Sequence, residues 1–295
     1  MKLRIKELLS RTLEGKMFPV AIPTEYDRED LFLSPVQRSA KRACEFIMNQ
    51  EPIVPEECAF TGLLTFDDSV EGEIFNRRGH RAFREAMNAF YNKPINNLST
   101  FEWQHSTADF EYIIKNGSKE VRKEISLSLV DHKGDPEATE FLNALTLFCD
   151  TVNAWAKKCG DKAKKVAQAT NNEEYRTNLE KLSKALNKVP EHPAESFYEA
   201  MLSLFVCYSF VPDSIGLIDR YLYPYYLKDK ASGVLSDEEA TGYLQELFLM
   251  LQGRIHIESD RFYRGGESHF AVGGYLPNGE DGFTEFSRLI VEALM

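Results

Sequence analysis

Five cysteines and six histidines are the side chains best suited to nucleophilic or metal chemistry in this 295-residue sequence. The cysteines form no Cys-x-x-Cys pair, and no histidine stands at ligand spacing from another histidine or a cysteine. Because a protein zinc site needs such clustered ligands, the spacing predicts no metal site. The residues concerned are Cys44, Cys58, Cys149, Cys159 and Cys207, and His80, His105, His132, His192, His256 and His269.

Other local signals for catalysis are weak. Asp67 and Asp68 are adjacent in the sequence, and adjacent side chains do not face each other on a helix or a strand. The pair Gly273-Gly274 lacks the spacing of a phosphate-binding loop and predicts a tight turn instead. The sequence contains no GxxxxGK, HExxH or GxSxG motif, so no self-contained active site is indicated.

The composition limits the class of protein. Hydrophobic residues make up 43% of the sequence and charged residues 27%, as in ordinary globular proteins. A net charge of −11 repels phosphate backbones and argues against a nucleic-acid partner. The most apolar stretch, residues 197–211, is too short to span a bilayer, and the N-terminus has no signal-peptide pattern. The odd number of widely spaced cysteines favours a reducing compartment, so we expect a cytoplasmic protein without a membrane partner.

Two strong helix starts are visible. Ser34-Pro35 combines an N-cap with proline in the first turn and predicts a helix over 34–49. Ser236 and Glu239 form a capping box in front of a second apolar helical pattern.

The middle of the sequence also predicts helices. Apolar spacing indicates a helix over 136–158, with Gly160 as its C-terminal stop. The lysine-rich stretch 161–188 predicts an exposed outer helix. Another helix is expected from Pro193 onward, with Cys207 on its apolar face as a small buried hydrophobe.

The C-terminal part combines short strands with a last helix. Residues 254–257 and 269–275 are compatible with strands, and 277–279 predicts a turn. A helical pattern begins near Phe283, and its apolar face has no partner that the sequence identifies. That face consists of Phe286, Leu289, Ile290 and Ala293.

Four stretches, in this order, resemble the glycyl radical enzymes, the family of pyruvate formate-lyase and the radical dehydratases. Residues 34–54 are similar to the family's first long helix and the segment that follows it. Residues 189–200, Val-Pro-Glu-His-Pro-Ala-Glu-Ser-Phe-Tyr-Glu-Ala, resemble its proline–phenylalanine–glutamate–alanine signature. Residues 216–229 are similar to Gly-Arg-x-Asp-Gln-x-x-x-Pro-Tyr, and residues 273–287 to Gly-Gly-x-x-x-x-Gly-x-Asp with a downstream serine.

The sequence departs from the family pattern at four positions and lacks two motifs. The family's cysteine motif Gly-Cys-x-Glu and its radical-glycine motif Arg-Val-x-Gly-Tyr do not occur. We therefore expect the N-terminal part of a longer enzyme, inactive by itself. The substitutions bear on the substrate more than on the fold; they are Leu202 for glutamine, Leu217 for arginine, Arg220 for glutamine and Thr284 for asparagine.

The resemblance implies a fold and a reaction. The fold would be α/β and predominantly helical, with residues 1–295 forming one incomplete domain, the N-terminal portion of a ten-stranded α/β barrel. The reaction would be a lyase reaction, of the dehydratase-like branch, on a small polar substrate through hydrogen abstraction by a thiyl radical. The radical would be installed by an activating enzyme that uses S-adenosylmethionine and an iron–sulfur cluster, so this chain needs no cofactor of its own. The intact enzyme would be a homodimer.

The resemblance also implies three substrate-binding residues and no catalytic residue in this chain. His105 stands at the place of a histidine that lines the pocket in some dehydratases. Asp213 lies in a stretch that contributes a carboxylate in relatives, and Ser259 resembles another pocket position.

Two alternatives stay open. The chain could be a non-catalytic paralogue that binds another protein or a small ligand, with the apolar face of the last helix as its interface. It could also be a plain helical bundle, a reading that the absence of a parallel strand over 254–275 would support.

Overall fold

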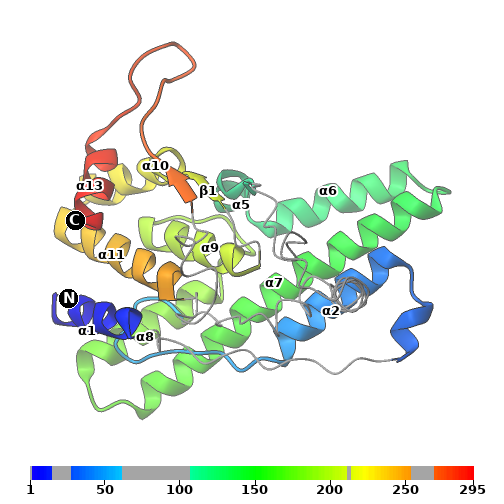
Figure 1. The fold of residues 1–295 in the computed structure, drawn as a ribbon, viewed down its shortest axis with the longest axis horizontal. Coiled ribbons are helices and arrows are strands. Elements are labelled where there is room, and N and C mark those ends of the chain that lie inside the picture. The colour runs from blue at the N-terminus through cyan, green and yellow to red at the C-terminus, as the bar shows by residue number, and fades with distance from the viewer. Residues whose placement is uncertain (1, 15–27, 62–106, 211–213, 254–268) are drawn as a thin grey trace, which may run out of the picture.

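The computed structural model describes residues 2–14, 28–61, 107–210, 214–253 and 269–295. Helices dominate these ranges, and a small parallel sheet lies against them (Figure 1). None of the described helices is both long and apolar enough to cross a membrane. The helices are α1 (Lys2–Leu13), the 3-10 helix η1 (Arg28–Phe32), α2 (Pro35–Asn49), α5 (Phe110–Asn116), α6 (Ser118–Asp131), α7 (Pro136–Ala169), α8 (Glu173–Leu186), α9 (Phe197–Phe210), α10 (Ile218–Ala231), α11 (Asp237–Gly253) and α13 (Glu285–Leu294).

Both predicted helix starts are confirmed. The Ser34 hydroxyl accepts a hydrogen bond from the Gln37 amide, and the Gln37 side chain accepts one from the Ser34 amide. The Glu239 carboxylate accepts from the Ser236 amide at 2.9 Å, and the Ser236 hydroxyl accepts from the Glu239 amide at 3.2 Å. Each box satisfies backbone donors that the first helical turn leaves without partners.

The predicted helix stop at Gly160 is wrong, because α7, which has 34 residues, continues through Gly160 to Ala169. Gly160 has a different role: a Cβ there would lie 2.9 Å from Nδ2 of Asn187 and 3.2 Å from Cβ of Leu186. The glycine therefore allows the end of α8 to approach α7 closely. Helix α7 ends instead at Ala169, with Thr170 as its C-cap. Asn172 caps the start of α8, where its side chain accepts hydrogen bonds from two backbone amides.

Helix α8 is not the exposed outer helix predicted for the stretch 161–188. Its polar face is exposed, but a row of leucines is buried against the rest of the core. At the centre of that core, α9 is buried on nearly every side, from Phe197 to Phe210. The buried leucines of α8 are Leu179, Leu182 and Leu186.

The sheet consists of β1 (Ser214–Leu217) and β2 (His269–Ala271), which run parallel. Strand β2 confirms the prediction of a strand within 269–275, and its parallel pairing contradicts the plain helical bundle. Strand β1 was not predicted. The other expected strand, residues 254–257, lies outside the described ranges.

Helix α13 was expected to lack a partner for its apolar face, and that prediction is wrong. The helix packs against α10 and α11, and its apolar face is buried by them. Phe286, which is fully buried, stacks on Tyr226 of α10 at 4.8 Å between ring centroids. Phe197 of α9 meets the ring of Phe286 edge-on, with 5.6 Å between the ring centroids.

Candidate functional site

Three chain segments meet side by side at the sheet. Thr107 forms a parallel bridge with Ser214 of β1, and Ser214 is in register with His269 of β2. The Ser214 hydroxyl donates to the carbonyl of His269 at 3.3 Å. Gly216 has a φ of 72°, and a Cβ at this position would lie 2.9 Å from Cγ2 of Thr107. A glycine is therefore needed where the Thr107 segment runs beside β1.

The three predicted substrate-binding residues lie outside the described ranges, at 105, 213 and 259. In the sequence, His105 precedes Thr107 by two positions and Asp213 directly precedes Ser214. The structure thus brings together the described neighbours of these two residues, at one parallel bridge. Ser259 is six positions after Gly253 and ten before His269, so no described residue lies as close to it in the sequence as Thr107 and Ser214 lie to the other two. All three assignments stay predictions.

A buried carboxylate joins the third and fourth family-like stretches. Asp219, in the first turn of α10, is 2% exposed. Its Oδ2 accepts hydrogen bonds from the Gly273 amide at 2.7 Å and from the Ser287 hydroxyl at 2.5 Å. One side chain therefore holds the start of α10, the end of β2 and the start of α13 together.

Arg220 adds a second connection at the same place. Its guanidinium donates to the carbonyls of Gly273 and Gly274, at 2.7 and 3.2 Å. A Cβ on Gly282 would lie 1.8 Å from Nη2 of Arg220, so Gly282 leaves the space that the guanidinium occupies. Asp219 and Arg220 together fix the loop that follows β2, and hence the register of β2 on β1.

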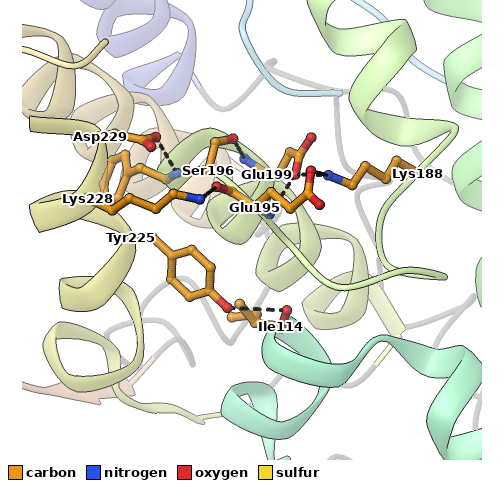
Figure 2. Close-up of polar contacts among 9 residues, drawn as sticks. Ile114, Lys188, Glu195, Ser196, Glu199, Tyr225, Lys228 and Asp229 are labelled. Carbon is orange, nitrogen blue, oxygen red and sulfur yellow. Dashed lines mark hydrogen bonds and ion pairs between the residues drawn. The ribbon is translucent and has the colours of Figure 1, made fainter. Parts of the chain in front are cut away.

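A polar cluster joins the second and third stretches (Figure 2). The Asp229 carboxylate accepts from the Phe197 amide at 2.7 Å, and Nζ of Lys228 donates to the carbonyl of Glu195 at 2.8 Å. Lys188 forms ion pairs with Glu195 and Glu199, at 2.6 and 2.7 Å. The hydrogen bond from Lys188 lowers the pKa of Glu195. These contacts anchor the start of α9 to the end of α10 and have a structural role.

Sequence reasoning missed a second buried carboxylate, Glu246 on α11. It accepts from the amides of Ala59 and Phe60, at 2.5 and 3.1 Å, and its Oε2 lies 2.9 Å from Nη2 of Arg4. Burial raises its pKa to about 7, although Arg4 and the two amides act in the opposite direction. The neighbouring thiol of Cys58 has a raised pKa for the same reason, with the charge of Glu246 adding to it.

The described cysteines are not poised as nucleophiles. Burial raises the pKa of each of the five thiols, that of Cys207 to about 12, so they are protonated near neutral pH. Within the described ranges, no three His, Cys, Asp or Glu side chains gather in a way that could hold a metal ion.

Comparison with known proteins identifies the arrangement. The family model described as pyruvate formate lyase-like matches residues 66–295. The sequence is 27% identical over 214 residues to an isethionate sulfite-lyase of Bilophila wadsworthia, a match that covers 66% of this chain and 25% of the relative. It is 23% identical over 202 residues to a trans-4-hydroxy-L-proline dehydratase of Clostridioides difficile, covering 62% of this chain and 26% of the relative. The chain thus spans about a quarter of the length of these curated relatives.

Solved structures share the fold over nearly the whole chain. The B12-independent glycerol dehydratase of Clostridium butyricum superposes with a TM-score of 0.77 at 18% identity, covering 98% of this chain and 45% of that one. A structure of 1,2-propanediol dehydration in Roseburia inulinivorans gives a TM-score of 0.77 at 19% identity, covering 98% and 43%. The predicted fold class, the N-terminal portion of a glycyl radical enzyme barrel, is confirmed by this likeness.

Proposed function

Because the chain belongs to the pyruvate formate lyase-like family, we propose that it is part of a glycyl radical lyase that acts on a small polar substrate. The observation that carries the proposal is the buried contact of Asp219 with Gly273 and Ser287, which we call the Asp219 junction. This carboxylate hydrogen-bonds to Gly273 and Ser287, and so joins two stretches of the sequence that resemble family signatures. The same contacts fix the pairing of β1 with β2, and two of the predicted substrate-binding residues, His105 and Asp213, lie in the sequence next to the residues of the Thr107–Ser214 bridge.

The proposed role of this chain is to bind and orient the substrate. The catalytic cysteine and the radical glycine would supply hydrogen abstraction, and their motifs do not occur in these 295 residues. His105 and Asp213 are proposed to bind the substrate, where an imidazole or a carboxylate can hydrogen-bond to its hydroxyl groups. Ser259 is proposed as a further hydrogen-bonding residue. The barrel wall would exclude water from the reacting groups.

We favour a dehydratase-like reaction, in which a C–O bond next to the abstracted hydrogen breaks and water leaves. Cleavage of a C–S bond is the second candidate, since the sulfite-lyase relative is 27% identical and the dehydratase relative 23%. The proposed partners are a radical-activating enzyme with S-adenosylmethionine and an iron–sulfur cluster, and a second copy of the intact enzyme. The proposed location is the cytoplasm.

The alternative of a non-catalytic binding protein loses its supporting feature. It depended on an apolar face of the last helix without a partner, and that face is buried against α10 and α11.

The proposal is tested on the complete reading frame of the gene, read past the codon for Met295. The product is expressed without oxygen together with a radical-activating enzyme and examined by electron paramagnetic resonance. We expect the doublet of a glycyl radical and turnover of one substrate among isethionate, trans-4-hydroxyproline, glycerol and 1,2-propanediol. A stop codon directly after Met295, or a product that forms no radical, would overturn the proposal.

Variants then test the binding residues. His105→Ala and Asp213→Ala are expected to lower kcat/KM by about 10- to 100-fold, the size of a lost hydrogen bond to a charged group, while the radical signal persists. His132→Ala is the matched control, because His132 is an exposed residue at the C-terminal end of α6, 25 positions after Thr107 in the sequence. Unchanged turnover in both site variants would remove these residues from the proposal while leaving the reaction type intact.

A further inference from the structure

A pocket of about 530 Å³ lies between α5, α6, α7 and α9. This volume is in the range of small-molecule sites, roughly 300–1,000 Å³. Most of the wall is apolar, and Phe148 and Phe210 meet edge-on at its side, with 5.7 Å between ring centroids. The apolar wall is made by Phe110, Ile113, Val121, Leu145, Phe148 and Phe210.

The interior of this pocket carries no charge. The thiols of Cys149 and Cys207 line it, and burial raises the pKa of both, so they are neutral. The Ser118 hydroxyl is already engaged, donating to Oδ1 of Asn153 at 2.6 Å. Among the described residues that line the pocket none is basic, so they offer no cationic partner for an anion. The interior therefore suits an uncharged aryl or alkyl group.

The mouth of the pocket is negatively charged. Asp109 and Glu124 are exposed at its rim, on either side of Tyr112. Oδ1 of Asp109 accepts from the Tyr112 amide at 2.9 Å, and Oε1 of Glu124 accepts from the Tyr112 hydroxyl. The second oxygen of each carboxylate has no hydrogen-bond partner among the described residues. The nearby carboxylates raise the pKa of Tyr112 to about 12, Glu124 most of all.

Neither of the two basic side chains directly before Glu124 forms an ion pair with it. Lys123 is paired with Glu120 at 2.6 Å, and Arg122 with Asp150 at 2.9 Å. The rim thus presents two carboxylates and an aromatic ring to whatever enters. This is the combination that attracts an ammonium group, through ionic hydrogen bonds and through the ring face.

We propose that this pocket binds an organic cation, with its ammonium group at Asp109, Tyr112 and Glu124 and its aryl or alkyl body among the apolar side chains. The site requires no radical chemistry and stands independently of the proposed function. The carboxylate oxygens replace part of the hydration of the ammonium group, and the apolar wall removes the body of the ligand from water. A ligand with a carboxylate in place of the amine would meet repulsion at the same rim.

Three ligands of equal shape test the proposal by isothermal titration calorimetry with the complete protein at low salt. They are 4-phenylbutylamine, 4-phenylbutan-1-ol and 4-phenylbutyrate. We expect the amine to bind about fivefold or more tightly than the alcohol, since a partly exposed charge contact contributes of the order of 1 kcal/mol. The carboxylate should bind most weakly. Equal affinity of amine and alcohol, or no measurable binding of the amine, would overturn the proposal.

Paired variants locate the site. Glu124→Gln should remove most of the preference for the amine, whereas Glu174→Gln, on the exposed first turn of α8, should not. Val121→Phe should block the pocket, whereas Val130→Phe places the same ring at an exposed position of the same helix. Circular dichroism verifies that each variant is folded. If the amine binds equally well to all four variants, it binds elsewhere and the proposed site is wrong.

Discussion

Asp219 and Glu246 show how single buried carboxylates connect distant parts of this chain. Each accepts at least two hydrogen bonds from segments far away in the sequence, and each is almost completely buried. A buried carboxylate is costly unless such donors surround it, because it gives up its hydration. The buried donors likewise need the carboxylate, because without it they would have lost their hydration and have no acceptor.

The first prediction concerns Asp219. Asp219→Ala removes the acceptor of both the Gly273 amide and the Ser287 hydroxyl. The buried amide is left without a partner, whereas the hydroxyl keeps Oγ1 of Thr284 at 3.1 Å. We expect a loss of about 3 kcal/mol in the free energy of unfolding, measured by urea denaturation. Asp161→Ala, at an exposed position of α7, is the control and should change stability by less than about 0.5 kcal/mol. Equal effects of the two substitutions would show that the junction is not structural.

The second prediction concerns the pH dependence of stability through Glu246, whose pKa is raised to about 7 in the folded protein against 4.5 ordinarily. Between these values the folded state holds a proton that the unfolded state has lost. The stabilising contribution of the protonated acid is therefore complete below pH 4.5 and is lost as the pH rises through about 7. Glu246→Gln cannot titrate.

We expect the stability of the Glu246→Gln variant relative to the unsubstituted protein to improve steadily between pH 4.5 and 7. Denaturant titrations of both proteins at several pH values measure this difference. Glu238→Gln, on the exposed first turn of the same helix, serves as the control. A difference that does not change with pH in the Glu246 pair would contradict the raised pKa.

At the scale of elements, the connection between α5 and α6 depends on one glycine. Gly117 has φ 77° and ψ 158°, a conformation that is nearly restricted to glycine. A Cβ there would lie 2.5 Å from the carbonyl oxygen of Glu191. That close approach lets the carbonyls of Pro190 and Glu191 accept from the first amides of α6, at 2.8 and 3.1 Å. The second family-like stretch thereby caps a helix that has no side-chain cap of its own.

The third prediction follows from this geometry. Gly117→Ala should destabilise the protein by more than about 3 kcal/mol, because backbone strain and a steric clash add. Gly134→Ala is a matched control: its φ is 105°, but nothing lies within 4 Å of an added Cβ. It should lose only the conformational part, about 1–2 kcal/mol. Thermal unfolding of both variants measures the difference, and equal losses would show that the clash is relieved by a small shift.

Elements specified by local chemistry were predictable from the sequence, and elements that depend on packing were not. The caps at Ser34 and Ser236 involve residues three positions apart, so their signal is visible in the sequence. Gly160 carries the same local signal as a helix stop, but its close contact with α8 decides its role. The apolar face of α13 had no identifiable partner, because α10 and α11 are brought to it only by the complete fold.

The site could be predicted only in part, for the same reason. The residues Asp219, Gly273 and Ser287 were visible as parts of a resemblance, but nothing in their types or spacing placed them in contact. Strand β1 is only four residues long, too short to show a periodic pattern, and it pairs with Thr107 and β2, which are distant in the sequence. Glu246 lies within an ordinary helical pattern and carries no local signal of burial. His105, Asp213 and Ser259 stay predictions.

At the scale of the whole molecule, two regions differ sharply in burial. Helix α9 is enclosed by its neighbours, whereas residues 126–150, where α6 and α7 project as a two-helix arm, include no buried residue (Figure 1). Local opening is least costly where few apolar contacts are lost. The arm should therefore open independently of the core.

The fourth prediction is a gradient of hydrogen exchange. Amides of residues 126–150 should exchange orders of magnitude faster than those of α9. Mass spectrometry of peptic peptides measures both regions in one experiment, and α8, which is half exposed but closely packed on α7, provides an intermediate reference. Equal protection in the arm and in α9 would mean that the arm is covered by a further part of the molecule.

The contact between Arg4 and Glu246 also has a consequence for the time course of synthesis. The helix on which α1 packs, α11, leaves the ribosome about 240 residues after α1, which takes roughly 12–50 s at about 5–20 residues per second. Throughout that interval Leu8, buried in the finished molecule, lacks the packing surface that α11 provides. Helix α1 therefore reaches its final position only after α11 has been made, and a nascent chain stalled before residue 246 carries an amphipathic helix whose apolar face a chaperone can bind.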